Sequence, residues 1–350
     1  MITIKEIASH LNMSTTTVSN VIHGKTGEVS PDTIARVQAY LDEVGYVPNI
    51  NARNLAANQS NIIGVVIKTR EDHYMHILSE PFVAEILGGI DEVIRSAGYY
   101  MMLYISDDIA DILDKVAAWN TDGLLLFWMI DDDALRVYKR YRKPVVCVDT
   151  YISGEVIHQF EDSFVNIGLE DEESTYEAVN YLISMGHRRI GFLSDNHDGV
   201  DLERYKGFRR ALQDADIPLR DEDFFELHST KLEIESSMKA MAEKARDYTA
   251  VFCCSDLYAS MLINACERSG LHVPDDVSVV GFDDTFPSRL SRPQITTIHQ
   301  DITGKGRLAT ETLLKMIRKE KPMTDQIILK PKLLIRESVA DIRDKAQKSS

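Results

Sequence analysis

The hydrophobic positions near the start of the chain recur every three or four residues, the spacing of short amphipathic helices. Thr3 followed by Glu6 has the pattern of a capping box at the start of the first helix. Ser14 begins a second helix, and Ser30, followed by proline, begins a third that ends at Gly45. The inward positions are Ile4, Ile7, Ala8, Leu11, Val18, Val21, Ile22, Ile34, Val37 and Leu41. Two short helices joined by a tight turn, with a third beneath them, predict a helix-turn-helix head over residues 1–46.

From residue 61 the pattern changes to continuous apolar runs separated by longer stretches with helical spacing. The runs lie at 62–67, 100–105, 123–130, 145–149, 190–194, 250–256 and 277–283, and the helical stretches include 81–98 and 171–186. Such alternation is typical of parallel sheets covered on both faces. We therefore expect an α/β core of two doubly wound subdomains, with a ligand site at the carboxyl ends of the strands, in the cleft between them.

The predicted second helix carries short polar side chains on its outer face. Thr15, Thr16, Ser19 and Asn20 point outward if the valines point inward. Threonine is a poor helix former, so its repeated use needs a reason. Hydroxyl groups at a helix N-terminus can contact phosphates and base edges, which favours a DNA-reading helix. The alternative interpretation is that residues 14–17 only cap the helix.

Charge stands against this interpretation. The chain of 350 residues has a net charge of −16, and residues 1–60 hold four basic and five acidic side chains. A DNA-binding function must therefore rest on the pattern of residues rather than on a basic surface.

The remaining composition is that of an ordinary globular protein. Four cysteines without CxxC spacing are expected to be buried free thiols, and an HxxH at His73 and His76 is expected to be a polar loop rather than a zinc site. There is no long apolar run and no signal-like start, so a cytoplasmic location is expected. We expect no cofactor and no metal. Dinucleotide fingerprint, P-loop, nucleophile elbow and triad are all missing from the sequence, which disfavours an enzyme.

Several ordered segments carry a more specific signal. They are TIKEIASHLNMSTTTVSNVI (3–22), YVPNINARNLAANQSNIIGVV (46–66), GHRRIGFLS (186–194), RYKGFRRAL (204–212), VPDDVSVVGFDD (273–284) and PQITTIHQD (293–301). Together they closely resemble the lac/gal repressor (LacI/GalR) family of bacterial transcription regulators over nearly the whole chain. The resemblance implies a homodimeric, cytoplasmic repressor that binds a pseudo-palindromic operator and responds to a small-molecule effector.

The resemblance also implies a hinge helix within residues 47–60 that enters the minor groove as a symmetric pair. Leu55 would be the apolar wedge between base steps, and Ala52 would permit close approach of the two helices. The alternative for Leu55 is an ordinary linker residue. The complete set of predicted DNA contacts is Thr3, Ser14, Thr15, Thr16, Ser19, Asn20, His23, Ser30, Asn49, Ala52 and Leu55.

The reader helix departs from the family pattern. Asn20 stands where many members have arginine, and His23 where many have asparagine. Asparagine pairs with adenine whereas arginine pairs with guanine, so we predict an A·T pair opposite Asn20. The alternative is that the shorter side chain does not reach a base.

Polar residues at strand ends form the predicted effector site. The resemblance places the counterparts of Asp149, Arg204, Asp256 and Asp283 around the effector, and Phe82 and Trp128 supply a stacking wall, with Ser79 beside them. Carboxylates accept hydrogen bonds from hydroxyls and arginine donates a fork of them, which suits a sugar or polyol. The alternative for each aspartate is a helix N-cap, which we prefer for Asp284. Glu80, in place of the usual asparagine, disfavours anionic effectors.

The resemblance implies a discontinuous core over residues 61–340. One subdomain is expected to use 61–160 and 292–323, the other 161–291 and 324–340, and the tail at 341–350 is polar without a tetramerising heptad. Two other functions compete with a regulator. A sugar-binding protein without a DNA role is disfavoured by the head, and a Rossmann-type enzyme by the missing motifs.

Overall fold

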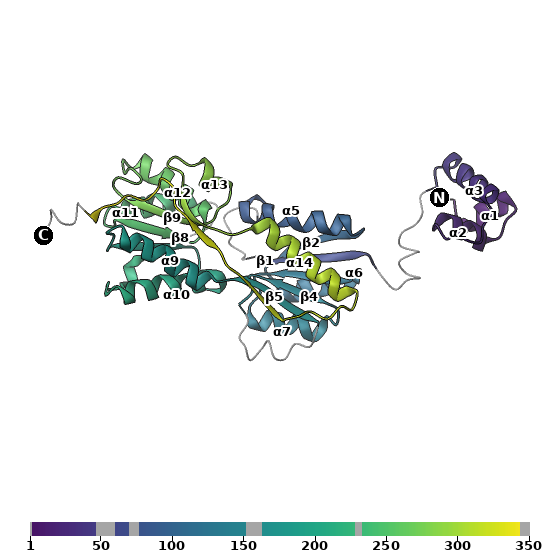
Figure 1. Ribbon diagram of the computed structural model, residues 1–350, viewed down its shortest axis with the longest axis horizontal. Helices are drawn as coiled ribbons and strands as arrows, with labels where there is room; N and C mark the ends of the chain where they lie inside the picture. The colour runs from purple at the N-terminus through teal and green to yellow at the C-terminus, as the bar shows by residue number, and fades with distance from the viewer. Residues whose placement is uncertain (1, 47–59, 70–76, 152–162, 228–232, 344–350) are drawn as a thin grey trace. The chain divides into compact units, whose positions relative to one another are not determined.

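The computed structural model describes residues 2–46, 60–69, 77–151, 163–227 and 233–343. The chain divides into two compact units, Met1–Ser60 and Asn61–Ser350 (Figure 1). Each unit has a hydrophobic core of its own. Among the described residues, no helix is long and apolar enough to cross a membrane.

The first unit is the predicted bundle of three helices. They are α1 (Ile4–Leu11), α2 (Thr15–Ile22) and α3 (Pro31–Glu43). Each begins at the expected cap: Thr3 makes a reciprocal capping box with Glu6, and the Ser14 and Ser30 hydroxyls accept from the third backbone N–H that follows. Val18 and Val37 are fully buried at the centre of the bundle. The predicted helix-turn-helix head is confirmed.

The second unit contains two six-stranded sheets. The first sheet has the order β11-β5-β4-β3-β1-β2 and the second the order β12-β10-β9-β8-β6-β7. Within each sheet the strands run parallel except for β12, which is antiparallel to β10. The strands are β1 (Ile62–Lys68), β2 (Tyr100–Ser106), β3 (Gly123–Phe127), β4 (Val145–Val148), β5 (Phe164–Leu169), β6 (Ile190–Ser194), β7 (Phe224–Glu226), β8 (Ala250–Cys253), β9 (Ser278–Asp283), β10 (Thr296–His299), β11 (Gln326–Leu329) and β12 (Lys332–Leu334).

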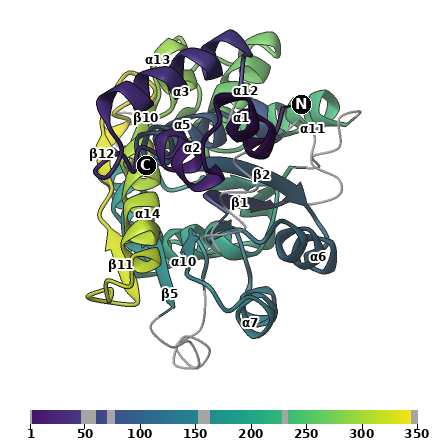
Figure 2. The ribbon, with the colours of Figure 1, turned by 90° about the vertical axis from the view of Figure 1, so that its right-hand side faces the viewer.

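Helices cover both faces of each sheet. On the first sheet, α5 (Pro81–Ser96) and α14 (Ile302–Ile317) lie side by side on one face, and α6 (Ile109–Trp119) and α7 (Asp131–Arg140) cover the other (Figures 1 and 2). On the second sheet, α9 (Asp171–Ser184) and α10 (Gly199–Asp214) cover one face, and α11 (Ile234–Ala245) and α12 (Asp256–Arg268) the other. The short elements are η1 (Ile77–Ser79), η2 (Asp221–Asp223) and α13 (Phe286–Leu290). The doubly wound fold predicted from the alternating runs is confirmed.

The division between the two subdomains differs from the expected one at three strands. β5 and β11 pair in the first sheet although residues 161–291 and 324–340 were assigned to the second subdomain, and β10 pairs in the second sheet although 292–323 was assigned to the first. In each case the chain passes to the other subdomain after this strand, whereas the prediction had it pass before the strand. Figure 1 shows the last crossing, in yellow, between β11 and β12.

Candidate functional site

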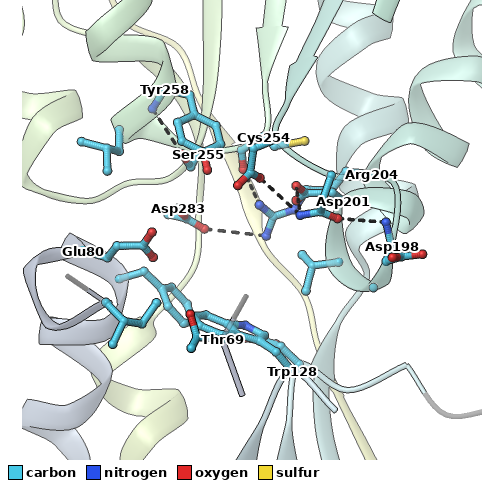
Figure 3. Close-up of a pocket in the computed structure, with 18 of the residues that line it drawn as sticks. Thr69, Glu80, Trp128, Asp198, Asp201, Arg204, Cys254, Ser255, Tyr258 and Asp283 are labelled. Atoms are coloured by element: carbon cyan, nitrogen blue, oxygen red, sulfur yellow. Dashed lines mark hydrogen bonds and ion pairs between the residues drawn. The ribbon is translucent and has the colours of Figure 1, made fainter. Parts of the chain in front are cut away.

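A pocket of about 350 Å³ lies between the two subdomains of the second unit (Figure 3). Its walls come from residues that follow strands β1, β3 and β4 of the first sheet and β6, β8 and β9 of the second. The two strand orders reverse between β1 and β3 and between β6 and β8. The pocket therefore occupies the place where doubly wound sheets bind ligands.

The wall on the first sheet is aromatic. Phe82, in the first turn of α5, and Trp128, directly after β3, have ring centroids 6.1 Å apart and are tilted by 31°. Both were predicted as a stacking wall, and both line the pocket. Phe82 is positioned by Pro81 at the start of α5, where a proline fits the first helical turn.

Asp149 also lies on this wall, and its carboxylate pairs with a buried lysine of α14. Both of its carboxylate oxygens are 2.8 Å from Nζ of Lys305, a side chain of α14 that is fully buried. The same Nζ lies 5.2 Å from the centre of the Phe82 ring. Burial raises the pKa of Asp149, and the Lys305 charge acts against that rise. One buried ammonium thus supports both an acidic and an aromatic residue of the wall.

The wall on the second sheet centres on Arg204, a buried residue of α10. Its Nε donates to Asp171 Oδ1 at 2.8 Å, Nη1 donates to the Cys254 carbonyl, and Nη2 lies 3.7 Å from Asp283 Oδ1. The guanidinium also stacks on the Phe282 ring, 3.5 Å from its centre. Nε and Nη1 of Arg204 therefore help to hold the site together, and Nη2 is the nitrogen nearest the pocket acid (Figure 3).

Two acids of this wall are poorly compensated. Burial raises the pKa of Asp283 to about 7, although Arg204 and a hydrogen bond from Gln300 to Asp283 Oδ1 lower it. Burial, together with the charge of Asp195, raises the pKa of Asp201 to about 6. Two carboxyl groups that titrate near neutral pH are typical of a functional site.

Backbone strain also gathers at the pocket. Trp128, Asp149 and Asp283 have φ of 57°, 49° and 108°, in the left-handed region that side chains other than glycine rarely adopt. All three come at or directly after the end of a strand and line the pocket. Such strain is commonly found where a side chain must be turned toward a ligand.

The structure corrects two predicted effector residues. Asp256 is not on the pocket wall: its Oδ2 accepts from the Thr285 backbone N–H at 2.7 Å and its Oδ1 from the Thr297 hydroxyl at 2.5 Å. It ties α12 to β10 and to the segment after β9, while Ser255 caps the helix. Ser79 is also off the wall, because η1 ends there and leaves it exposed one residue before Glu80, which does line the pocket.

Several residues that line the pocket or support its walls were not predicted. Lys305, which supports Asp149 from α14, stands in a Gly-Lys-Gly segment, and a lysine between glycines on an apolar helix face was the available signal. Asp195, Asp198 and Asp201 follow β6, a strand whose polar end was not considered. Asp284 is not a helix cap; it accepts hydrogen bonds from Arg336 and Ser288 and pairs with His299.

In the head, the predicted DNA-contact residues gather at one helix and its flanks. Thr15, Thr16 and His23 are exposed, and Ser19 and Asn20 are half-buried on α2. Thr3, Ser14 and Ser30 are exposed caps of the three helices. Thr17 has a separate use, since its hydroxyl hydrogen-bonds that of Ser14 at 2.9 Å. The capping alternative therefore accounts for residues 14 and 17 but leaves Thr15 and Thr16 free on the surface.

Some predictions lie outside the described residues. These are Asn49, Ala52 and Leu55 of the hinge helix and the pair His73 and His76. In the described part of the chain, no group of three or more acidic, histidine or cysteine residues is arranged to hold a metal. The four cysteines are buried free thiols, as predicted.

Known proteins match the chain over nearly its full length. Residues 3–49 match the bacterial regulatory proteins of the lacI family, and residues 179–339 match a periplasmic binding protein-like domain. The HTH-type transcriptional repressor PurR of Yersinia pestis is 37% identical, over 97% of this chain and 98% of the relative. The repressor of the same name from Photobacterium profundum is 32% identical, over 98% of this chain and 100% of the relative.

Solved structures show the same architecture. The transcriptional regulator CelR in complex with cellobiose is 26% identical, covers 97% of this chain and 100% of its own, and has a TM-score of 0.69. The lac repressor dimer bound to operator and the anti-inducer ONPF is 24% identical, covers 97% and 99%, and has a TM-score of 0.80. At that identity the second likeness concerns the fold alone.

Proposed function

Since the chain belongs to the lac/gal repressor (LacI/GalR) family and is a DNA-binding transcriptional repressor of that family, we propose that a sugar or polyol in its pocket changes its affinity for operator DNA. The proposal rests on one arrangement, an aromatic wall of Phe82 and Trp128 facing carboxylates across a pocket at the strand ends. Aromatic faces pack against C–H surfaces, and carboxylates accept from hydroxyls. The relative CelR is described in complex with cellobiose, a ligand of this class.

The proposed active form is a cytoplasmic homodimer on a pseudo-palindromic operator. Two hydrophobic side chains of α13, Phe286 and Leu290, are 60% and 57% exposed and share one helix face at the i, i+4 spacing. A second copy of the chain is the proposed cover for this face. Two α2 helices would then read two half-sites, each through Thr15, Thr16, Ser19 and Asn20.

Effector and operator are coupled through the same protein. If the effector weakens operator binding by some factor, operator DNA must weaken effector binding by the same factor. If the effector acts as a co-repressor, the coupling has the opposite sign, and each ligand strengthens binding of the other. The pocket is built from both sheets, so a ligand that contacts both walls changes the balance between open and closed arrangements of the two subdomains.

Binding-site selection from a randomised duplex pool tests the DNA function. The full-length protein is used, with and without a small-molecule cell extract so that a co-repressor is covered. We expect a pseudo-palindrome with adenine opposite Asn20, and we expect Asn20→Ala to lose the preference at that base alone. Gln38→Ala removes an exposed amide from α3 and serves as the control. Guanine at that base contradicts the role of Asn20, and failure to enrich any motif contradicts the regulator.

A further inference from the structure

The charges on the pocket walls are strongly unequal. Among the described lining residues, two are basic, Lys68 and Arg204, and six are acidic: Glu80, Asp149, Asp195, Asp198, Asp201 and Asp283. Both basic groups already pair with carboxylates that do not line the pocket, Lys68 with Asp133 and Arg204 with Asp171. Lys68 is therefore not a free counter-ion for the acids of the wall, and Arg204 shares its single charge between Asp171 and Asp283.

The acids differ between the two walls. Asp149 on the first sheet is neutralised from behind by Lys305, whose Nζ is 2.8 Å from both carboxylate oxygens. On the second sheet, Asp283 has a longer ion pair with Arg204, whose guanidinium also pairs with Asp171. Asp283 Oδ1 accepts from Gln300 at 2.6 Å, and Arg204 Nη2 stays 3.7 Å from the same oxygen. The pocket is thus aromatic and neutralised on one side and anionic on the other.

Asp283 also has an oxygen left for a ligand. The residue is 6% exposed, and no hydrogen bond from the described residues reaches its Oδ2. Figure 3 shows its carboxylate turned into the pocket, opposite Trp128. A donor on a ligand in the pocket can reach this oxygen and complete its hydrogen bonding.

We propose that the effector is a small hydroxylated amine, with its protonated nitrogen at Asp283 and its carbon skeleton on Phe82 and Trp128. This rests on the proposed function of the pocket as the effector site. A neutral polyol offers hydroxyl donors but leaves the excess negative charge in place. An ammonium group offers donors and a counter-ion together, and a charge-assisted hydrogen bond is roughly twice as strong as a neutral one.

The titration of Asp283 supports the same ligand class. Because burial raises its pKa to about 7, part of the population is protonated at neutral pH. A cation binds the ionised form better, so amine binding expels that proton and strengthens as the pH rises through 7. The other charged groups that act on Asp283 are Arg204, Lys305, Asp171 and Asp256, and burial also raises the pKa of Asp201 nearby. The affinity for an uncharged polyol is not expected to increase as the pH rises through 7.

Two matched series of compounds test the proposal. Each keeps one skeleton and changes only the charge: glucamine, glucitol and gluconate, and glucosamine, glucose and glucuronate. Binding is followed by the fluorescence of Trp128 in a Trp119→Phe background, because the chain has only these two tryptophans and Trp119 lies 60% exposed on α6. Titrations of the full-length protein are run near pH 6 and near pH 8.

We expect the amine of at least one series to bind at least tenfold more tightly than its neutral partner. Glucamine, whose amine stays protonated in this range, is expected to bind more tightly at the higher pH. Asp283→Asn should remove both the preference and its pH dependence, and Asp201→Asn should reduce them if the first variant does not fold. Asp247→Asn, the same change at an exposed position, is the control.

Equal binding within each series, preference for the alcohol or acid, or no response from either amine overturns the proposal. Operator binding is measured on the same samples. A protein that binds its operator but shows no preference for amines contradicts only the ligand class. A protein that prefers amines but binds no operator, with or without them, contradicts the proposed function instead.

Discussion

At the scale of single residues, the site depends on charges taken out of water and held by specific partners. Lys305 and Asp149 form a buried pair, and Arg204 is held by Asp171 and the Cys254 carbonyl. A buried ion pair adds little net stability, but removal of one partner leaves an uncompensated charge. Stability should therefore fall when one residue of such a pair is replaced, and should fall much less when both are replaced together.

Lys305→Met should destabilise the core by about 3–5 kcal/mol, because it leaves the Asp149 carboxylate buried and unpaired. The double variant Lys305→Met with Asp149→Asn should recover most of that loss. Asparagine is suitable because position 149 has a positive φ, which it tolerates. Urea unfolding of the three proteins measures the effect. A single variant as stable as the wild type would show that the pair is not needed to keep Asp149 buried.

Asp283 should make stability depend on pH. Its folded pKa of about 7 lies well above the ordinary pKa of an aspartate, so the folded state binds more protons between these values. The contribution of Asp283 to the free energy of unfolding therefore falls as the pH rises from 4 to 7. Asp283→Asn lacks this titration. We expect its melting temperature, relative to the wild type, to rise between pH 5 and pH 8, and a constant difference would contradict the raised pKa.

At the scale of elements, close packing of α5 against α14 sets the aromatic wall over Lys305. An added Cβ at Gly89 would lie 2.2 Å from the Thr303 backbone oxygen, and one at Gly306 would lie 2.5 Å from the Ile86 backbone oxygen. Backbone atoms cannot move aside cheaply in a packed interior. The two glycines therefore fix how closely the helices approach.

Neighbouring glycines of α5 should respond in opposite directions. Gly89→Ala should lower the free energy of unfolding by about 1–3 kcal/mol, because the methyl group forces the helices apart. Gly88→Ala has nothing within 4 Å and should raise it by about 0.5–1 kcal/mol through helix propensity. Thermal unfolding of both variants gives the comparison. Destabilisation of similar size in both would mean that the α5–α14 contact is looser than described.

At the scale of the whole molecule, net charge limits how the protein can hold DNA. Residues 1–60 carry only four basic side chains, Lys5, Lys25, Arg36 and Arg53, within a chain of net charge −16. Nonspecific attraction to the phosphate backbone is therefore small. Discrimination between sites must come from fit at the reader helix and from the shape of the DNA.

The proposed dimer should show a shallow salt dependence. With four basic residues in each head, the slope of log K against log salt should not exceed about −7 in magnitude, since each neutralised phosphate contributes about −0.9. Fluorescence anisotropy on the selected operator and on a scrambled duplex measures it. A steeper slope would mean that basic residues outside residues 1–60 contact the DNA.

The sequence by itself determined what local spacing encodes. Helix caps, apolar stripes and continuous apolar runs depend on neighbours in the chain, and so the head, the main strands and the pocket at the strand ends were predicted correctly. Arg204 and Asp283 were found because a resemblance pointed to their positions, whereas Phe82 and Trp128 were proposed as aromatic side chains able to stack on a ligand. Strands β5, β10 and β11 were assigned to the wrong subdomain because sheet membership depends on which distant strand a segment pairs with, and local spacing does not encode that.

Only the tertiary structure decided which polar groups are free. Asp149, Asp256 and Asp283 look alike in the sequence, since each stands at or near the end of an apolar run. In the fold, Lys305 from 156 positions away neutralises the first, two threonines occupy the second, and one oxygen of the third stays open to the pocket. The availability of a carboxylate depends on its desolvation and its partners, and long-range packing supplies both.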